Sequence, residues 1–162
     1  MPSSPEPQAG FAARMMALHG RLDERFFAHQ RALLDRDFVR ADAALAEYEQ
    51  RLERHIDDEE AHVLPRYEAA GGDATDAPLR LFRGEHRNLR AFVAEFARRL
   101  EELRAAPDDR ALLELLDRQA TFKNLLLHHD LRERNALYPF LERHLDAGQQ
   151  HAVLTALSWS GD

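Results

Sequence analysis

The chain has no cysteine among its 162 residues. This absence excludes disulfide bonds, iron–sulfur clusters and zinc sites built from thiolates. Any metal ion would therefore be held by histidine and carboxylate side chains. The sequence also lacks an apolar stretch long enough for a signal peptide or a membrane span, so we expect a cytoplasmic protein without a membrane partner.

An excess of positive charge is missing as well. Lysine and arginine total 22 against 29 aspartates and glutamates, which gives a formal net charge of -7. No local basic patch is visible that would attract nucleic acid or an anionic membrane. We therefore expect no nucleic-acid partner.

Glycine and proline, seven of each, are absent from long stretches and gathered at a few places, as expected for long helices joined by short turns. The length suits a single domain. The spacing of apolar residues predicts helices over about 11–34, 40–67, 79–103 and 110–145, and no segment alternates as a strand would. We predict an all-α, up-down-up-down four-helix bundle over 11–145, a disordered segment over 1–10, and a tail over 146–162 with a short helix near 149–157.

The last long helix shows which residues should face the core. Its apolar residues recur at steps of three and four, which gives it one inward stripe. That stripe is predicted to hold Leu115, Phe122, Leu126, His129, Glu133, Ala136 and Phe140. Pro65 and Pro139 are expected to end or kink their helices.

A short motif occurs twice in the chain. His55 and Glu59 are four residues apart, and His129 and Glu133 repeat that spacing 74 residues later. Residues four apart lie one above the other on one face of a helix. Each half of the chain therefore directs one imidazole and one carboxylate to the same side.

The positions of the turns test whether these groups meet, because antiparallel helices bring together residues equidistant from the turn between them. The midpoint of His19 and His55 is residue 37, in the first turn, and that of His86 and His129 falls between residues 107 and 108, in the third. The midpoints of His86 with His55 and with Glu59 bracket the glycine pair of the middle turn. The spacing predicts one layer formed by His19, His55, Glu59, His86, His129 and Glu133.

Four imidazoles and two carboxylates buried together are costly unless something compensates them, and a metal does so. Imidazole and carboxylate suit iron, manganese or zinc. A carboxylate from each half can bridge two ions while two histidines cap each ion. Each ion then has about four protein donors, which leaves room for a solvent-derived bridge and a small ligand.

From His19 to Leu145 the chain resembles the hemerythrin-like, or HHE cation-binding, domains. The likeness lies in His19, in the Glu85-His86 pair, and in the two HxxxE motifs followed by Val63-Leu64-Pro65 and Leu137-Tyr138-Pro139. The resemblance implies a non-haem di-iron centre, two iron ions with an oxo or hydroxo bridge, in preference to manganese or zinc. It also implies a function in binding or reducing a diatomic or peroxide ligand, such as oxygen, peroxide or nitric oxide.

Two departures separate this chain from the oxygen-carrying members of that family. Their third helix resembles HxxxH, whereas His86 is followed four residues later by Arg90, and Glu133 comes four rather than five residues after His129. Reversible oxygen storage is therefore not expected. Because arginine cannot ligate a cation, both irons should keep an exchangeable position unless His62 turns inward to occupy one.

Other functions stay open at this stage. An iron- or oxygen-sensing or storage module would be non-enzymatic, and the four-His, two-Glu set is also similar to that of iron-centre repair proteins. Glu59 and His62 form the ExxH pair of a ferritin-like oxidase, but Ala136 stands where the second half would need a histidine. A metal-free polar network or a bundle that serves as an interaction surface would need no metal at all.

The remaining polar candidates are expected to have structural or surface roles. Tyr48 faces the interior, where its hydroxyl could reach a bound ligand or a backbone carbonyl. His128 points away from His129, either to solvent or towards the outer side of a metal-binding residue. A structural role is expected for His29, His144 and His151, and a solvated charged face for Asp57, Asp58 and Glu60.

Overall fold

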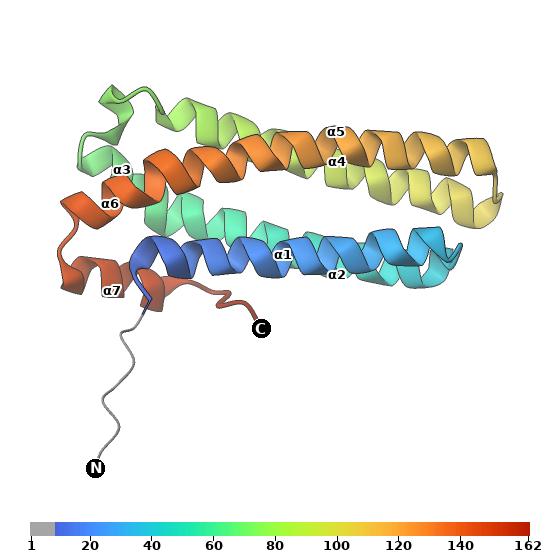
Figure 1. Cartoon of the computed structure of the whole chain (residues 1–162), viewed down its shortest axis with the longest axis horizontal. Helices are drawn as coiled ribbons and strands as arrows, with labels where there is room; N and C mark the ends of the chain where they lie inside the picture. Colours follow the sequence, from blue (N-terminus) through green and yellow to red (C-terminus); the bar gives the residue numbers. More distant parts are fainter. Residues whose placement is uncertain (1–8) are drawn as a thin grey trace, which may run out of the picture.

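The computed structural model describes residues 9–162, so most of the segment expected to be disordered, residues 1–8, lies outside the described residues. Four long helices, α1 (Phe11–Leu34), α2 (Phe38–Asp58), α4 (Leu79–Ala105) and α5 (Asp109–Arg132), run antiparallel to their sequence neighbours (Figure 1). The predicted all-α, up-down-up-down bundle is confirmed. No helix in the described part of the chain is long and apolar enough to cross a membrane.

Side chains at the turns explain where α2 and α5 begin. The carboxylate of Asp37 accepts a hydrogen bond from the backbone of Arg40 at 3.0 Å, and that of Asp108 accepts one from Ala111 at 2.8 Å. These N-caps satisfy amides that have no partner within their own helix. In the middle turn Gly71 has φ 88°, a left-handed conformation that favours glycine, and a short 3-10 helix, η2 (Gly72–Ala74), follows.

Each copy of the repeated motif contains one turn of π-helix. The segment η1 (Glu59–Val63) follows α2 and leads into α3 (Leu64–Ala69), and η3 (Glu133–Leu137) follows α5 and leads into α6 (Tyr138–His144). A proline in the first turn of each resumed helix lacks the N–H of a regular α-helical hydrogen bond. The prolines expected to end or kink the helices, Pro65 and Pro139, thus follow a π turn, and the helix then continues.

The second π turn changes which residues face the core. Ala136 and Phe140, predicted to face inward, are only partly buried, whereas Leu137, Tyr138 and Leu141 are fully buried. A π turn holds one more residue than an α turn and therefore rotates the following residues around the helix axis. The prediction of the inward face was wrong beyond Glu133 for this reason.

The expected C-terminal helix is present as α7 (Ala147–Ala156), at the end of the bundle that also holds α3 and α6 (Figure 1). Val153 on α7 and Trp159 beyond it are buried. The carboxylate of Asp58 accepts hydrogen bonds from the backbone of Ser158 at 2.9 Å and of Trp159 at 3.1 Å. The tail is therefore fastened to the last turn of α2, next to the repeated motif.

Candidate metal centre

All six residues of the predicted layer are buried and lie together. One comes from each of the six segments α1, α2, η1, α4, α5 and η3, and none is more than 4% exposed. They form two overlapping groups of four whose potential ligand atoms lie within 4.8 Å of one another. Glu59 and Glu133 belong to both groups, the first of which adds His19 and His55, and the second His86 and His129.

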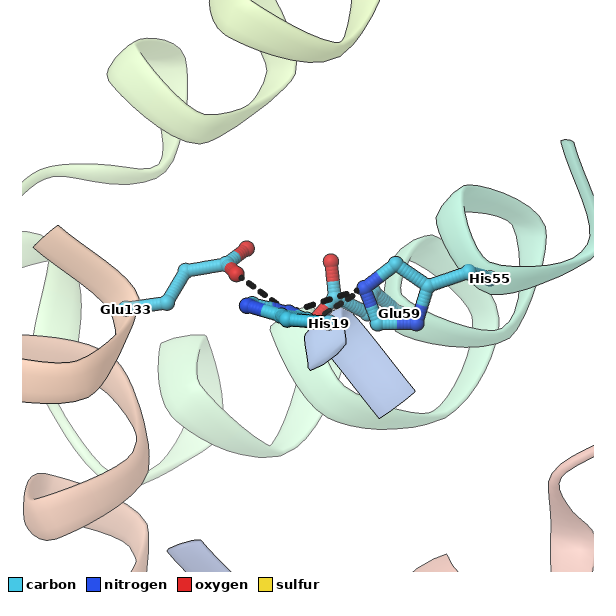
Figure 2. A group of neighbouring side chains, drawn as sticks. All are labelled: His19, His55, Glu59 and Glu133. Carbon is cyan, nitrogen blue, oxygen red and sulfur yellow. Dashed lines mark hydrogen bonds and ion pairs between the residues drawn. The ribbon is translucent and has the colours of Figure 1, made fainter. Parts of the chain in front are cut away.

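The first group is arranged around the imidazole of His19. Its Nε2 atom lies 3.1 Å from Nε2 of His55 and 3.1 Å from Oε2 of Glu133. Nε2 of His55 is 3.6 Å from Oε1 of Glu59. Figure 2 shows His19 between Glu133 and His55, with the carboxylate of Glu59 beside them.

The second group uses the other oxygen of each carboxylate. Nε2 of His129 is 3.1 Å from Oε1 of Glu133, and Nε2 of His86 is 3.3 Å from Oε2 of Glu59. Each carboxylate therefore turns one oxygen to each histidine pair. Two carboxylates placed in this way can bridge two cations that are each capped by two imidazoles.

Outer carboxylates hold three of the four imidazoles by the nitrogen that faces away from the cluster. His86 is hydrogen-bonded to Glu60 (2.9 Å) and His129 to Glu85 (3.0 Å), and Nδ1 of His19 lies 3.2 Å from Asp130 without hydrogen-bond geometry. A carboxylate at Nδ1 keeps the proton on that nitrogen and leaves the lone pair of Nε2 directed at the cluster. This is the tautomer that binds metal ions.

Two of the acidic residues expected on a solvated face lie elsewhere. Asp58 is buried and binds the backbone of the C-terminal tail. The carboxylate of Glu60 accepts the hydrogen bond from His86, because the π turn that begins at Glu59 brings it towards α4. Asp57 is exposed and pairs with Arg90 at 2.7 Å.

The pKa values show how the cluster compensates its charges without a metal. Burial disfavours the charged form of His19, but the contacts with Asp130 and Glu133 outweigh it and raise its pKa to about 10. Against the same effect of burial, Glu133 and Glu59 raise the pKa of His86 to about 9. At His55 the effect of burial is larger than that of the neighbouring carboxylates, and the pKa is lowered. In the metal-free protein the two carboxylates are thus offset by protons on neighbouring imidazoles.

A cation would meet buried atoms whose contacts within the cluster lack hydrogen-bond geometry. Oε2 of Glu59, Nε2 of His86 and Oε1 of Glu133 are buried without a hydrogen bond to any described residue. Buried polar atoms are almost always satisfied, so a cluster of unsatisfied ones indicates a missing partner. All three are lone-pair donors that face the second group, and the donor set therefore fits a metal ion.

Tyr138 belongs to the centre, although no role was predicted for it. Its buried hydroxyl donates a hydrogen bond to Oε1 of Glu59 and lies 3.1 Å from Oε2 of Glu133 and 3.1 Å from Nε2 of His19. Counting by regular helix turns left it off the inward stripe. The signal available in the sequence was the proline directly after it, which accompanies the π turn.

The remaining candidates lie outside both groups. His29 is buried, donates from Nδ1 to the carbonyl of Ala41 at 2.8 Å and accepts from the Gln119 amide at 2.8 Å. Tyr48 is buried among aromatic rings, and its hydroxyl contacts no described hydrogen-bond partner. His62 is half-buried, and exposed positions are held by His128, His144 and His151.

Comparison with known protein families gives a match over most of the chain. A family model described as the hemerythrin HHE cation binding domain matches residues 11–141. No curated protein and no solved structure matches the chain. The matched span starts at the first residue of α1 and contains all six clustered residues together with Tyr138.

Proposed function

The chain belongs to the hemerythrin HHE cation-binding domain family, and from this premise we propose that it is a non-haem di-iron protein that binds or reduces a small oxidant. His19 and His55 would hold one ion, His86 and His129 the other, and Glu59 and Glu133 would bridge them. The observation that carries the proposal is that each of the two carboxylates presents its two oxygens to different histidine pairs. Zinc has no redox chemistry, and the resemblance to hemerythrin-like domains favours iron over manganese, so we propose iron.

The protein's own residues prepare this site for reaction. When bound, the iron pair supplies one-electron redox chemistry and Lewis acidity. Outer carboxylates lie at Nδ1 of three histidines, so Nε2 is the nitrogen that would bind an ion once its proton has left, and the buried layer excludes bulk water. An oxidant that reaches the cluster therefore meets an oriented and largely dry environment.

A small cavity beside the cluster supports the proposal that the ligand is small. Its volume is about 10 Å³, close to what a single water molecule needs. It is bounded by imidazoles of the cluster and by the apolar side chains of Leu22, Leu52, Ile56, Leu89 and Leu126. A ligand of two heavy atoms would need the lining side chains to move slightly, whereas an organic substrate would not fit.

The same cavity adjoins the surface. Asp23, Leu126 and Asp130 line both this cavity and a surface groove of about 460 Å³ formed by α1 and α5. Phe27 and Lys123 lie along the outer groove. We take this groove as the entry for the small ligand, with Leu126 at the boundary.

A second candidate function, sensing of iron or oxygen, is favoured by the C-terminal tail. The ring of Trp159 packs edge-on against the imidazole of His55 with 6.3 Å between ring centroids. A change in the position of His55 would therefore alter the packing of Trp159 and of the tail. In this alternative the occupied centre stabilises the tail and a partner protein detects its release.

The reaction with oxidants tests the leading proposal. Protein loaded with ferrous iron under anaerobic conditions is mixed with oxygen, hydrogen peroxide or nitric oxide and followed by stopped-flow absorbance. We expect at least one of the three to react within the mixing experiment, with no reversible uptake of oxygen. Zinc-loaded protein is the control and should not respond. Protein that holds two irons and reacts with none of the three would overturn the proposed function and favour sensing.

A further inference from the structure

The hydroxyl of Tyr138 lies among the donor atoms of the first group alone. It contacts Oε1 of Glu59 and Oε2 of Glu133, the two carboxylate oxygens that face His19 and His55, and it also contacts Nε2 of His19. The oxygens that face His86 and His129 are the opposite ones. The phenol oxygen is therefore on one side of the bridge.

The spacing of this oxygen is that of a ligand. Neighbouring donors of a six-coordinate ion lie about 3 Å apart when each is about 2.1 Å from the metal. His19 Nε2 is 3.1 Å from His55 Nε2, 3.1 Å from Glu133 Oε2 and 3.1 Å from the Tyr138 oxygen. The Tyr138 oxygen is also 3.1 Å from Glu133 Oε2. It is thus placed like the imidazole and carboxylate donors around it.

Packing keeps the hydroxyl at this position. Tyr138 is fully buried, and the ring of Phe11 packs edge-on against it with 6.1 Å between centroids. Since π turn η3 ends at Leu137, the helix geometry itself directs the next side chain into the layer. A buried hydroxyl needs a partner, and the partners within reach are donor atoms of the cluster.

We propose that Tyr138 is a fifth protein ligand of the ion held by His19 and His55, bound through its phenolate oxygen. This inference rests on the proposed two-metal site. Binding exchanges the O–H bond for an oxygen–metal bond and releases the proton to solvent, as for other acidic ligands. The first ion then has the donors His19, His55, Glu59, Glu133 and Tyr138, whereas the second has only His86, His129 and the two carboxylates.

The consequence is an asymmetric centre. The sequence alone suggested that both ions keep comparable open positions, because Arg90 replaces a fifth histidine. With Tyr138 bound, the exogenous ligand is directed to the ion held by His86 and His129. Of the two histidines of that ion, His129 lines the small cavity, so the ligand would reach the ion from the His129 side.

Ferric loading tests the assignment, because phenolate bound to iron(III) gives a charge-transfer band in the visible region. Metal content is measured on the same samples. We expect the band in the wild-type protein and in Tyr48→Phe, and its loss in Tyr138→Phe at retained iron content. Tyr48 is the matched control because it is a buried tyrosine outside the cluster. Resonance Raman spectra of the wild type, excited in the band, should show enhanced tyrosine ring vibrations whether or not the variant folds.

The outcomes separate the two proposals. Wild-type protein that holds two ferric ions without a visible phenolate band overturns the ligand assignment and leaves Tyr138 as a neutral hydrogen-bond donor to Glu59. A band that persists in Tyr138→Phe overturns it equally. Failure of the wild type to hold two ions would count against the proposed function instead.

Discussion

Nδ1 of His86 donates a hydrogen bond of 2.9 Å to the carboxylate of Glu60, which lies 3.9 Å from the guanidinium of Arg90. Glu60 is the sequence neighbour of the bridging candidate Glu59, and the π turn lets the two adjacent carboxylates serve different purposes. One faces the inside of the cluster and the other supports an imidazole from outside. Such outer contacts fix the orientation and the basicity of a ligating histidine.

Glu60→Ala should therefore weaken metal binding without removing a ligand. We expect affinity to fall by about 10- to 100-fold, the usual effect of losing such an outer contact. Competition with a chelator of known affinity measures the change. Glu114→Ala, which removes the same charge at an exposed position of α5, should leave affinity unchanged. Equal affinities of wild type and Glu60→Ala would show that the hydrogen bond does not support the site.

The metal-free protein should lose stability as the pH rises above neutrality. The pKa of His19 is about 10 and that of His86 about 9, both above the ordinary value of 6.5. Their protonation stabilises the fold fully below about pH 6.5, and this contribution disappears as the pH approaches the folded values. Thermal melts between about pH 7 and pH 10 should show a falling melting temperature, with a smaller fall after zinc loading. A metal-free melting temperature that stays level over this range would contradict the charge balance described above.

Blocking the small cavity should slow the reaction with oxygen and leave the iron content unchanged. Leu126→Trp narrows the boundary between the outer groove and the cavity. We expect oxidation of the ferrous protein by oxygen to slow on the order of tenfold, which corresponds to about 1.4 kcal/mol in the barrier. Leu127→Trp, at an exposed neighbour that lines only the outer groove, is the control. If both variants react at the wild-type rate at equal iron content, entry does not pass Leu126.

Asp58→Ala should release the C-terminal tail. The substitution leaves the backbone amides of Ser158 and Trp159 without their acceptor, at a cost of about 1–3 kcal/mol. Emission of Trp159, the single tryptophan of the chain, should shift to longer wavelength as the ring becomes exposed. Asp57→Ala, at an exposed position next to it, should leave the emission unchanged. An unshifted spectrum in Asp58→Ala would show that the tail is held by other contacts.

The sequence predicted the fold because the relevant signals are local. Turn residues and the spacing of apolar side chains set the four long helices, and equal distances from the turns placed His19 and His129 in one layer. Regular helix geometry was assumed beyond Glu133, so the π turn and the inward rotation of Tyr138 were missed. The outer carboxylate Glu60 was missed for a related reason, since its path to His86 depends on the π turn after α2.

The number of metal ions per chain tests the central claim most directly. Native mass spectrometry and elemental analysis of the iron-loaded protein should give two ions per chain, and Glu59→Ala combined with Glu133→Ala should hold neither firmly, because both carboxylates contribute to both groups. His144→Ala, at an exposed histidine outside the groups, should retain two. A wild-type protein that binds a single ion, and keeps it after both glutamates are replaced, would contradict the bridged two-metal centre.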